Sequence, residues 1–137
     1  MVFRYVISRL PLAVEAAVTL TVASLRLRWR PQSETSGLLG NARPPSTPSV
    51  PSAAASSEAV RIGRAVERMA AVLPWHPVCL PRAVAATSML RRRRIECRAH
   101  LGVRGDRPPE AHAWVTVGGV VVQGAPIDDV TELASFA

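Results

Sequence analysis

A cysteine bracketed by two prolines is the feature that most restricts how this chain folds. Pro77 and Pro81 flank Cys79, and a proline is harmless in the first turn of an α-helix, where its missing N–H breaks no hydrogen bond. Helix-forming residues follow as far as an arginine run at 91–94. Cationic side chains at that end suit the helix dipole. The pattern predicts a helix from about Leu80, with the thiol at its N-terminus and the arginines as a solvated helix end.

The residues after this helix read as strands. We predict a strand over Cys97–Val103 and a second over Ala111–Val117. Gly118-Gly119 is a two-residue hairpin signal, so Val120–Gln123 is predicted to return beside the second strand. The tail, 125–137, is too short to assign. Helices followed by antiparallel strands indicate an α+β fold with a small antiparallel sheet.

The first half of the chain divides into three segments by composition. Residues 1–30 are predicted to contain an apolar helix, and 31–57 form a flexible linker rich in Pro and Ser. A helix is predicted over Glu58–Leu73, with Ser57 as its N-cap and Pro74 as its stop. Its apolar positions recur at helical spacing: Ile62, Val66, Met69 and Leu73. At 137 residues, one core is expected.

The N-terminal apolar segment is a poor membrane span. Its charge-poor run from Leu10 to Leu25 contains Glu15 and is shorter than the roughly 20 residues that a bilayer crossing needs. A signal peptide is the alternative, but Glu15 lies within the apolar stretch and no suitable cleavage site follows. We expect this helix to dock on the rest of the domain. A peripheral membrane contact through its flanking arginines remains the second interpretation.

Charge and cysteine usage narrow the function classes only slightly. The net charge of +7 fits nucleic acid, an anionic membrane or an acidic peptide, but an aromatic content of 4% counts against a stacking surface for single-stranded nucleic acid. The two cysteines and three histidines lack metal-ligand spacing, so no metal and no cofactor is expected. A disulfide between Cys79 and Cys97 conflicts with the predicted helix, which would hold their Cα atoms about 20 Å apart.

Cys79 and His112 are the candidate catalytic pair. A helix N-terminus favours the thiolate over the thiol, and its unpaired N–H groups would stabilise an oxyanion. His112, on a strand that follows the helix, would act as the base, in the order that thiol proteases use. The competing interpretation is a buried structural cysteine. Cys97 and His100 are interpreted as structural, and His76 as a weak candidate for the cleft rim.

The residue that would orient His112 depends on the hairpin register. A tight turn at Gly118-Gly119 points Gln123 to the same face as His112, where it could accept the imidazole N–H. A one-residue bulge instead moves Gly124 onto that face and leaves no local group for the role. Asp128 or Asp129 could fold back from the tail, and the sequence leaves these alternatives open.

Two motifs and the segment between them resemble a known family. The motifs are Leu73-Pro74-Trp75-His76-Pro77-Val78-Cys79-Leu80-Pro81-Arg82 and Ala111-His112-Ala113-Trp114-Val115, with an Arg-rich helix end at 90–95 and Gly102-Val103-Arg104 between them. Jointly they are fairly specific, and singly none is. Over roughly residues 60–130, the chain resembles the transglutaminase-like cysteine peptidases of lasso peptide biosynthesis, the leader-peptidase half of the B protein.

The resemblance implies a papain- or transglutaminase-like fold, with 58–137 as the peptidase domain. It implies Cys79 as nucleophile and His112 as general base in removing the leader from a ribosomally made precursor peptide. The implied partners are that leader, a small leader-recognition protein and an ATP-dependent lasso cyclase, with no specific nucleic acid. The implied location is the cytoplasm, with membrane association as the alternative.

The chain departs from the family pattern at three positions. The family's third catalytic residue is an Asp twelve positions after the His, where this chain has Gly124. Thr116 stands where a Glu is common, and Arg94 where a Gly is usual. We therefore assign the third role to Asp129, with Gln123 as its alternative. The competing function is a non-enzymatic or degenerate basic scaffold that binds leader peptide or RNA. Transglutaminase-type amide transfer would use the same Cys and His.

Overall fold

The computed structural model describes residues 11–29, 39–40, 50–105 and 108–137. Three helices of this part come first, and four strands follow: α2 (Leu12–Trp29), α4 (Ala53–Val72), α5 (Cys79–Arg92), β1 (Arg98–Arg104), β2 (Glu110–Val117), β3 (Val120–Gln123) and β4 (Val130–Phe136). The strands form one antiparallel sheet in the order β3-β2-β1-β4. The predicted α+β arrangement, helices followed by a small antiparallel sheet, is confirmed.

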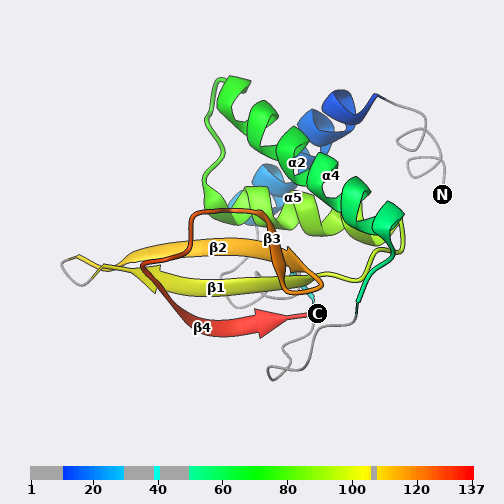
Figure 1. Cartoon of the computed structure of the whole chain (residues 1–137). Coiled ribbons are helices and arrows are strands. Elements are labelled where there is room, and N and C mark those ends of the chain that lie inside the picture. The colour runs from blue at the N-terminus through cyan, green and yellow to red at the C-terminus, as the bar shows by residue number, and fades with distance from the viewer. Residues whose placement is uncertain (1–10, 30–38, 41–49, 106–107) are drawn as a thin grey trace.

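The helices stack on one face of the sheet (Figure 1). α5 packs on β2 and α4 packs on β3, while α2 lies against α4 and α5. Ala113, Val115 and Val117 of β2 are buried in the core that these layers share. Because side chains alternate along a strand, His112 and Trp114 lie on the opposite face of β2. The candidate base is therefore on the sheet face that the helices do not cover.

α4 begins five residues before the predicted start. Its N-cap is Ser52, whose hydroxyl accepts a hydrogen bond from the Ala55 N–H at 3.1 Å, so the prediction of Ser57 as the cap is wrong. The reason is that alanines 53–55 are strong helix formers directly behind a good capping residue. The end of the predicted linker is thus helical, and most of the linker lies outside the described residues.

Gly63 lets α4 lie directly on β3. A Cβ at this position would come 1.7 Å from the carbonyl oxygen of Val122, a distance that no side chain can occupy. The close contact brings the polar side of α4 beside β3 and the turn that follows it. This approach decides which residues surround the candidate site.

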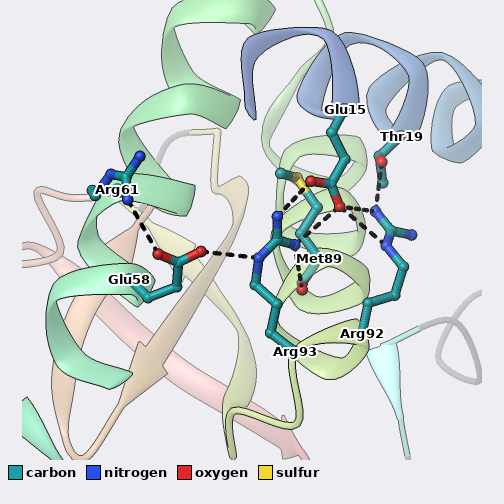
Figure 2. A network of polar contacts seen from close by, with 7 residues as sticks. All are labelled: Glu15, Thr19, Glu58, Arg61, Met89, Arg92 and Arg93. Carbon is teal, nitrogen blue, oxygen red and sulfur yellow. Dashed lines mark hydrogen bonds and ion pairs between the residues drawn. The ribbon is translucent and has the colours of Figure 1, made fainter. Parts of the chain in front are cut away.

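Two residues of the arginine run bind a buried carboxylate (Figure 2). Glu15 of α2 is 1% exposed, and the Arg93 Nη2 donates to its Oε2 at 2.5 Å. Arg92 donates to Glu15 Oε1 at 3.2 Å and to the Thr19 hydroxyl at 2.8 Å. The hydrogen bond to Glu15 is the main cause that raises the pKa of Arg93. The prediction of a solvated helix end is therefore wrong for Arg92 and Arg93.

The same run ties down the end of α5 in two further ways. Arg93 Nε also donates to Glu58 of α4 at 3.0 Å, and Arg91 donates to the carbonyl of Leu39. The arginines thus join α5 to α2, to α4 and to the segment at 39–40. Arg91, Arg92 and Arg93 therefore bind groups of the protein itself rather than an external anion.

The remaining boundaries lie close to the predicted ones, except at the C-terminus. α5 begins at Cys79 and β1 runs one residue later than predicted. β4 was not predicted, and it pairs with β1 from Arg104↔Val130 to Ala99↔Phe136. β4 is an edge strand whose exposed residues, 131–133, are consecutive, so it lacks the alternating pattern that predicts a strand. No helix among the described residues is long and apolar enough to cross a membrane.

Candidate active site

Cys79 is the first residue of α5, at a helix terminus that no side chain caps. The N-cap position is Val78, whose side chain makes no capping hydrogen bond. Pro81 has no N–H, so the uncapped donors of the first turn are the amides of Cys79 and Leu80. The thiol is partly exposed and donates to the carbonyl of Ala111 at 3.7 Å. The predicted placement of Cys79 at a helix N-terminus is confirmed.

The loop before Cys79 is held in place by the first turn of α5. Arg82 Nε donates to the carbonyl of Pro77 at 2.7 Å, and Pro77 itself is buried. His76 has a positive φ of 43°, a conformation that costs free energy for a residue with a side chain. Its side chain is exposed beside the terminus, and its role at the cleft rim stays a prediction.

His112 has a single defined tautomer in the structure. Its Nε2 lies 2.6 Å from the carbonyl oxygen of Gly124. A carbonyl oxygen only accepts hydrogen bonds, so Nε2 carries the hydrogen and the lone pair of the neutral ring is on Nδ1. The ring also stacks on the buried Trp114, with centroids 5.9 Å apart and an interplanar angle of 17°. His112 is therefore oriented as a base that would receive a proton on Nδ1.

A bulge in the hairpin explains why the carbonyl of Gly124 is the partner of His112. Val117 pairs with Val120 across Gly118-Gly119, but the register shifts so that Val115 pairs with Gln123. The extra residue moves Gly124 onto the His112 face, as expected for a bulge. The sequence-based expectation that no local group then remains was wrong, because the backbone carbonyl of Gly124 takes the role.

Gly124 has no room for a side chain. Its φ is +94°, and an added Cβ would lie 2.7 Å from the Cβ of Trp114 and 2.9 Å from the carbonyl of Ala113. The position where the resembling peptidases carry Asp thus acts here through its main chain. A carbonyl is a neutral acceptor, so it fixes the tautomer of His112 but stabilises an imidazolium less than a carboxylate would.

The two predicted third residues point elsewhere. The bulge turns Gln123 toward the helices, where its amide donates to Glu67 Oε1 at 2.6 Å. Asp129 accepts from Arg104 Nε at 2.9 Å, because the start of β4 lies beside the end of β1. The assignment of Asp129, or of Gln123 as its alternative, to orient His112 is therefore wrong. Asp128 is exposed.

Glu67 of α4 connects both halves of the candidate site and was missed by the sequence analysis. One carboxylate oxygen accepts from Arg82 at 2.7 Å, and the other accepts from Gln123 at 2.6 Å. Arg82 holds the loop before Cys79, and Gln123 precedes the residue that holds His112. Glu67 lies off the apolar face of the helix and belongs to no motif, so only its contacts reveal it.

The structure brings the helix terminus of Cys79 to the strand end that carries His112. The thiol contacts Ala111, the residue immediately before His112. Within the described residues, its hydrogen bond is to this main-chain carbonyl and not to the imidazole. Proton transfer would require Sγ to leave the Ala111 carbonyl and approach Nδ1, and such catalytic contacts are often loose before substrate binds.

Cys97 and His100 have contacts that suit structural residues. Cys97 is 8% exposed, and burial raises the pKa of its thiol above the ordinary value of 9.0, so the thiol stays protonated and unreactive. His100 also stacks on Trp114, with ring centroids 5.1 Å apart and an interplanar angle of 8°. Its ring nitrogens contact Glu132 and, at 2.8 Å, the hydroxyl of Thr116. Both cysteines are free.

Among the described residues, no group of three His, Cys, Asp or Glu side chains is placed to hold a metal ion.

Comparison with known proteins gives one match, to a family. No curated protein and no solved structure matches the chain. The family model described as the transglutaminase-like superfamily matches residues 17–136, which includes all three helices from within α2 onward and the whole sheet. The chain therefore belongs to the transglutaminase-like superfamily.

Proposed function

We propose that this protein is a cysteine peptidase that removes the leader from a ribosomally synthesised lasso precursor peptide. Cys79 is the nucleophile and His112 the general base. The observation that carries the proposal is the uncapped helix terminus at Cys79, placed against Ala111 beside a histidine of defined tautomer. Membership of a superfamily that includes cysteine peptidases supports the reaction class. The leader as substrate rests on the sequence resemblance.

The geometry suits an acyl-transfer mechanism. The Sγ proton passes to His112 Nδ1, and the thiolate attacks the carbonyl carbon of the scissile peptide bond. The amides of Cys79 and Leu80 donate to the resulting oxyanion. The imidazolium then gives its proton to the leaving amine as the C–N bond breaks. Water, deprotonated by His112, hydrolyses the thioester and releases the second product.

The proposed partners follow from the same resemblance. They are the precursor leader, a small leader-recognition protein that presents it, and an ATP-dependent cyclase that receives the product, in the cytoplasm or at a membrane surface. The test mixes the protein with its neighbouring precursor and recognition protein and follows the products by mass spectrometry. We expect cleavage that Cys79→Ala abolishes and that Cys97→Ala, the matched control, retains in part. Cleavage that survives Cys79→Ala would overturn the proposal.

One observation favours a second function, a non-enzymatic scaffold for leader peptide. The thiol donates to a main-chain carbonyl rather than to the imidazole, and the carboxylate that would complete a triad is replaced by Gly124. Iodoacetamide labelling against pH separates the two functions. A peptidase is expected to label at Cys79 well below pH 8, with Cys97 protected. Labelling of Cys79 only above pH 8.5 would favour the scaffold.

Amide transfer uses the same pair and differs only in the acceptor of the acyl group. Product analysis in the presence of a primary amine separates the two reactions. We expect a free carboxylate at the cleavage site, because water is the acceptor in the proposed reaction. An amine adduct as the main product would assign the protein to transferases.

A further inference from the structure

A groove of about 280 Å³ runs between α4 and β3. One wall is formed by α4, including Arg64 and Arg68, and the other by β3 and its following turn, including Val122 and Gly124. Gly124 is the residue whose carbonyl holds His112. The groove, named here the α4–β3 groove, therefore borders the residue that holds His112.

The groove carries positive charge that the protein itself does not neutralise. Arg64 and Arg68 are exposed, and neither has an acidic partner within ion-pair distance in the part of the chain that the structure describes. Glu67 lies between them in sequence, but its two oxygens are occupied by Arg82 and Gln123. Residues four apart on a helix are surface neighbours, so the two guanidinium groups project together.

Several other arginines near these elements are already paired with carboxylates, whereas, within the described residues, Arg64 and Arg68 are not. Arg61, one turn earlier on α4, is paired with Glu58 at 3.3 Å. Arg92 and Arg93 share the buried Glu15. Arg64 and Arg68 also border a second hollow, between α2 and α4, but that hollow touches no residue of the candidate site. Of the two hollows, the α4–β3 groove is the one that shares residues with the candidate site, namely Glu67 and Gly124.

We propose that the α4–β3 groove binds an acidic stretch of the substrate peptide, with its carboxylates on Arg64 and Arg68. The identity of the ligand as substrate rests on the proposed function, whereas the binding itself does not. Guanidinium groups recognise carboxylates through paired, charge-assisted hydrogen bonds. The lining includes no aromatic side chain, so it offers no stacking platform for bases, which favours peptide over RNA.

Binding is measured apart from cleavage, by fluorescence anisotropy with the full chain carrying Cys79→Ala. The probe is a fluorescein-labelled decapeptide of alternating Glu and Ser, compared with its Gln and Ser counterpart. We expect the acidic peptide to bind and the neutral one to bind at least fivefold more weakly. The double variant Arg64→Gln with Arg68→Gln is expected to lower the affinity for the acidic peptide by about five- to tenfold, since each exposed ion pair contributes modestly to the binding free energy.

The matched control is Arg26→Gln with Arg28→Gln, which removes the same charge from exposed positions on α2. This control is expected to change the affinity less than twofold. A second pair locates the peptide: Ala125→Glu, in the α4–β3 groove, is expected to weaken binding, and Ala13→Glu, in the second hollow, is not. The proposal would be overturned if both double arginine variants lost the same amount of peptide affinity. It would also be overturned if Ala13→Glu lowered the affinity more than Ala125→Glu.

The outcomes also separate this inference from the proposed function. If the peptide binds through Arg64 and Arg68 but the unmutated chain cleaves nothing, the groove proposal is supported and the peptidase function is rejected. If the chain cleaves the precursor at the same rate with and without Arg64 and Arg68, the peptidase function is supported and the groove proposal is rejected. A decauridine RNA that displaces the peptide with higher affinity and the same arginine dependence would assign the groove to nucleic acid.

Discussion

At the scale of single residues, Glu15 shows how one charge organises the helical layer. It interrupts the apolar N-terminal segment, and it is 1% exposed between Arg92 and Arg93 (Figure 2). A buried carboxylate is costly unless it is paired and hydrogen-bonded. The arginine run supplies those partners, so these distant charges depend on one another.

Replacing Glu15 is expected to destabilise the fold strongly. Glu15→Ala leaves Arg92 and Arg93 partly buried without their shared partner, and breaking such a pair costs roughly 3–5 kcal/mol. Chemical denaturation followed by circular dichroism gives the free energy of unfolding. Glu58→Ala is the control, because Glu58 is more exposed than Glu15, at 34% against 1% for the side chains, and its ion pairs contribute about 1 kcal/mol or less. Equal losses for the two variants would contradict the interpretation.

Gly124 is the second residue whose role is local and testable. Gly124→Asp introduces the side chain that the resembling peptidases carry, but at φ +94° and with its Cβ 2.7 Å from Trp114. We expect a loss of roughly 1–3 kcal/mol in unfolding free energy, and no gain in cleavage. Gly105→Asp is a matched control, because Gly105 has φ +71° and nothing within 4 Å of an added Cβ. A rise in cleavage rate with unchanged stability for Gly124→Asp would show that the main chain can readjust.

At the scale of elements, α5 begins without a cap and α4 begins with one. Ser52 caps α4 through the Ala55 N–H, whereas Val78 leaves the amides at the start of α5 without a side-chain acceptor. Serine, aspartate or asparagine would be preferred at such a position for stability. The missing cap is a local defect at the place where an oxyanion would need donors, as expected for a functional site.

Val78→Ser tests this trade between stability and activity. Position N3 is Pro81, which has no N–H, so the new hydroxyl would accept from the Leu80 amide. We expect the unfolding free energy to rise by up to about 1 kcal/mol and the cleavage rate to fall, because an oxyanion donor is occupied. Val78→Ala, which shortens the side chain without adding an acceptor, is the control. Equal activity in the serine and alanine variants would argue against the oxyanion role.

At the scale of the whole molecule, the candidate site is assembled between the two layers. Cys79, the proposed nucleophile, comes from the helical layer, and His112, the proposed base, comes from the sheet. Glu67 of α4 links the two layers through Arg82 and Gln123. A displacement of about 1 Å between such groups can cost up to about a hundredfold in rate. The position of α4 on β3, which Gly63 permits, is therefore part of the proposed catalytic geometry.

Glu67→Ala is expected to lower kcat about tenfold or more with little change in KM, because it loosens both the Cys79 loop and the Gly124 turn. Glu67→Gln, which keeps the length and an acceptor oxygen, should restore part of the rate. Glu58→Ala is the control, since Glu58 also links α4 to an arginine of α5, but at the far end of that helix. If both alanine variants lose kcat in proportion to stability alone, Glu67 has no positioning role.

What the sequence by itself determined is local: the helix start between Pro77 and Pro81, the hairpin turn at Gly118-Gly119, and the α+β order of elements. These depend on the conformational preferences of neighbouring residues, so they can be read without the fold. The tertiary structure decided the partners: Gly124 for His112, Glu67 for Gln123, and Glu15 for Arg92 and Arg93. Those contacts join residues 12 to 78 positions apart, and a single bulge reverses the face of Gln123. β4 likewise required β1 as its pairing partner, because its own residues show no regular alternation of buried and exposed positions.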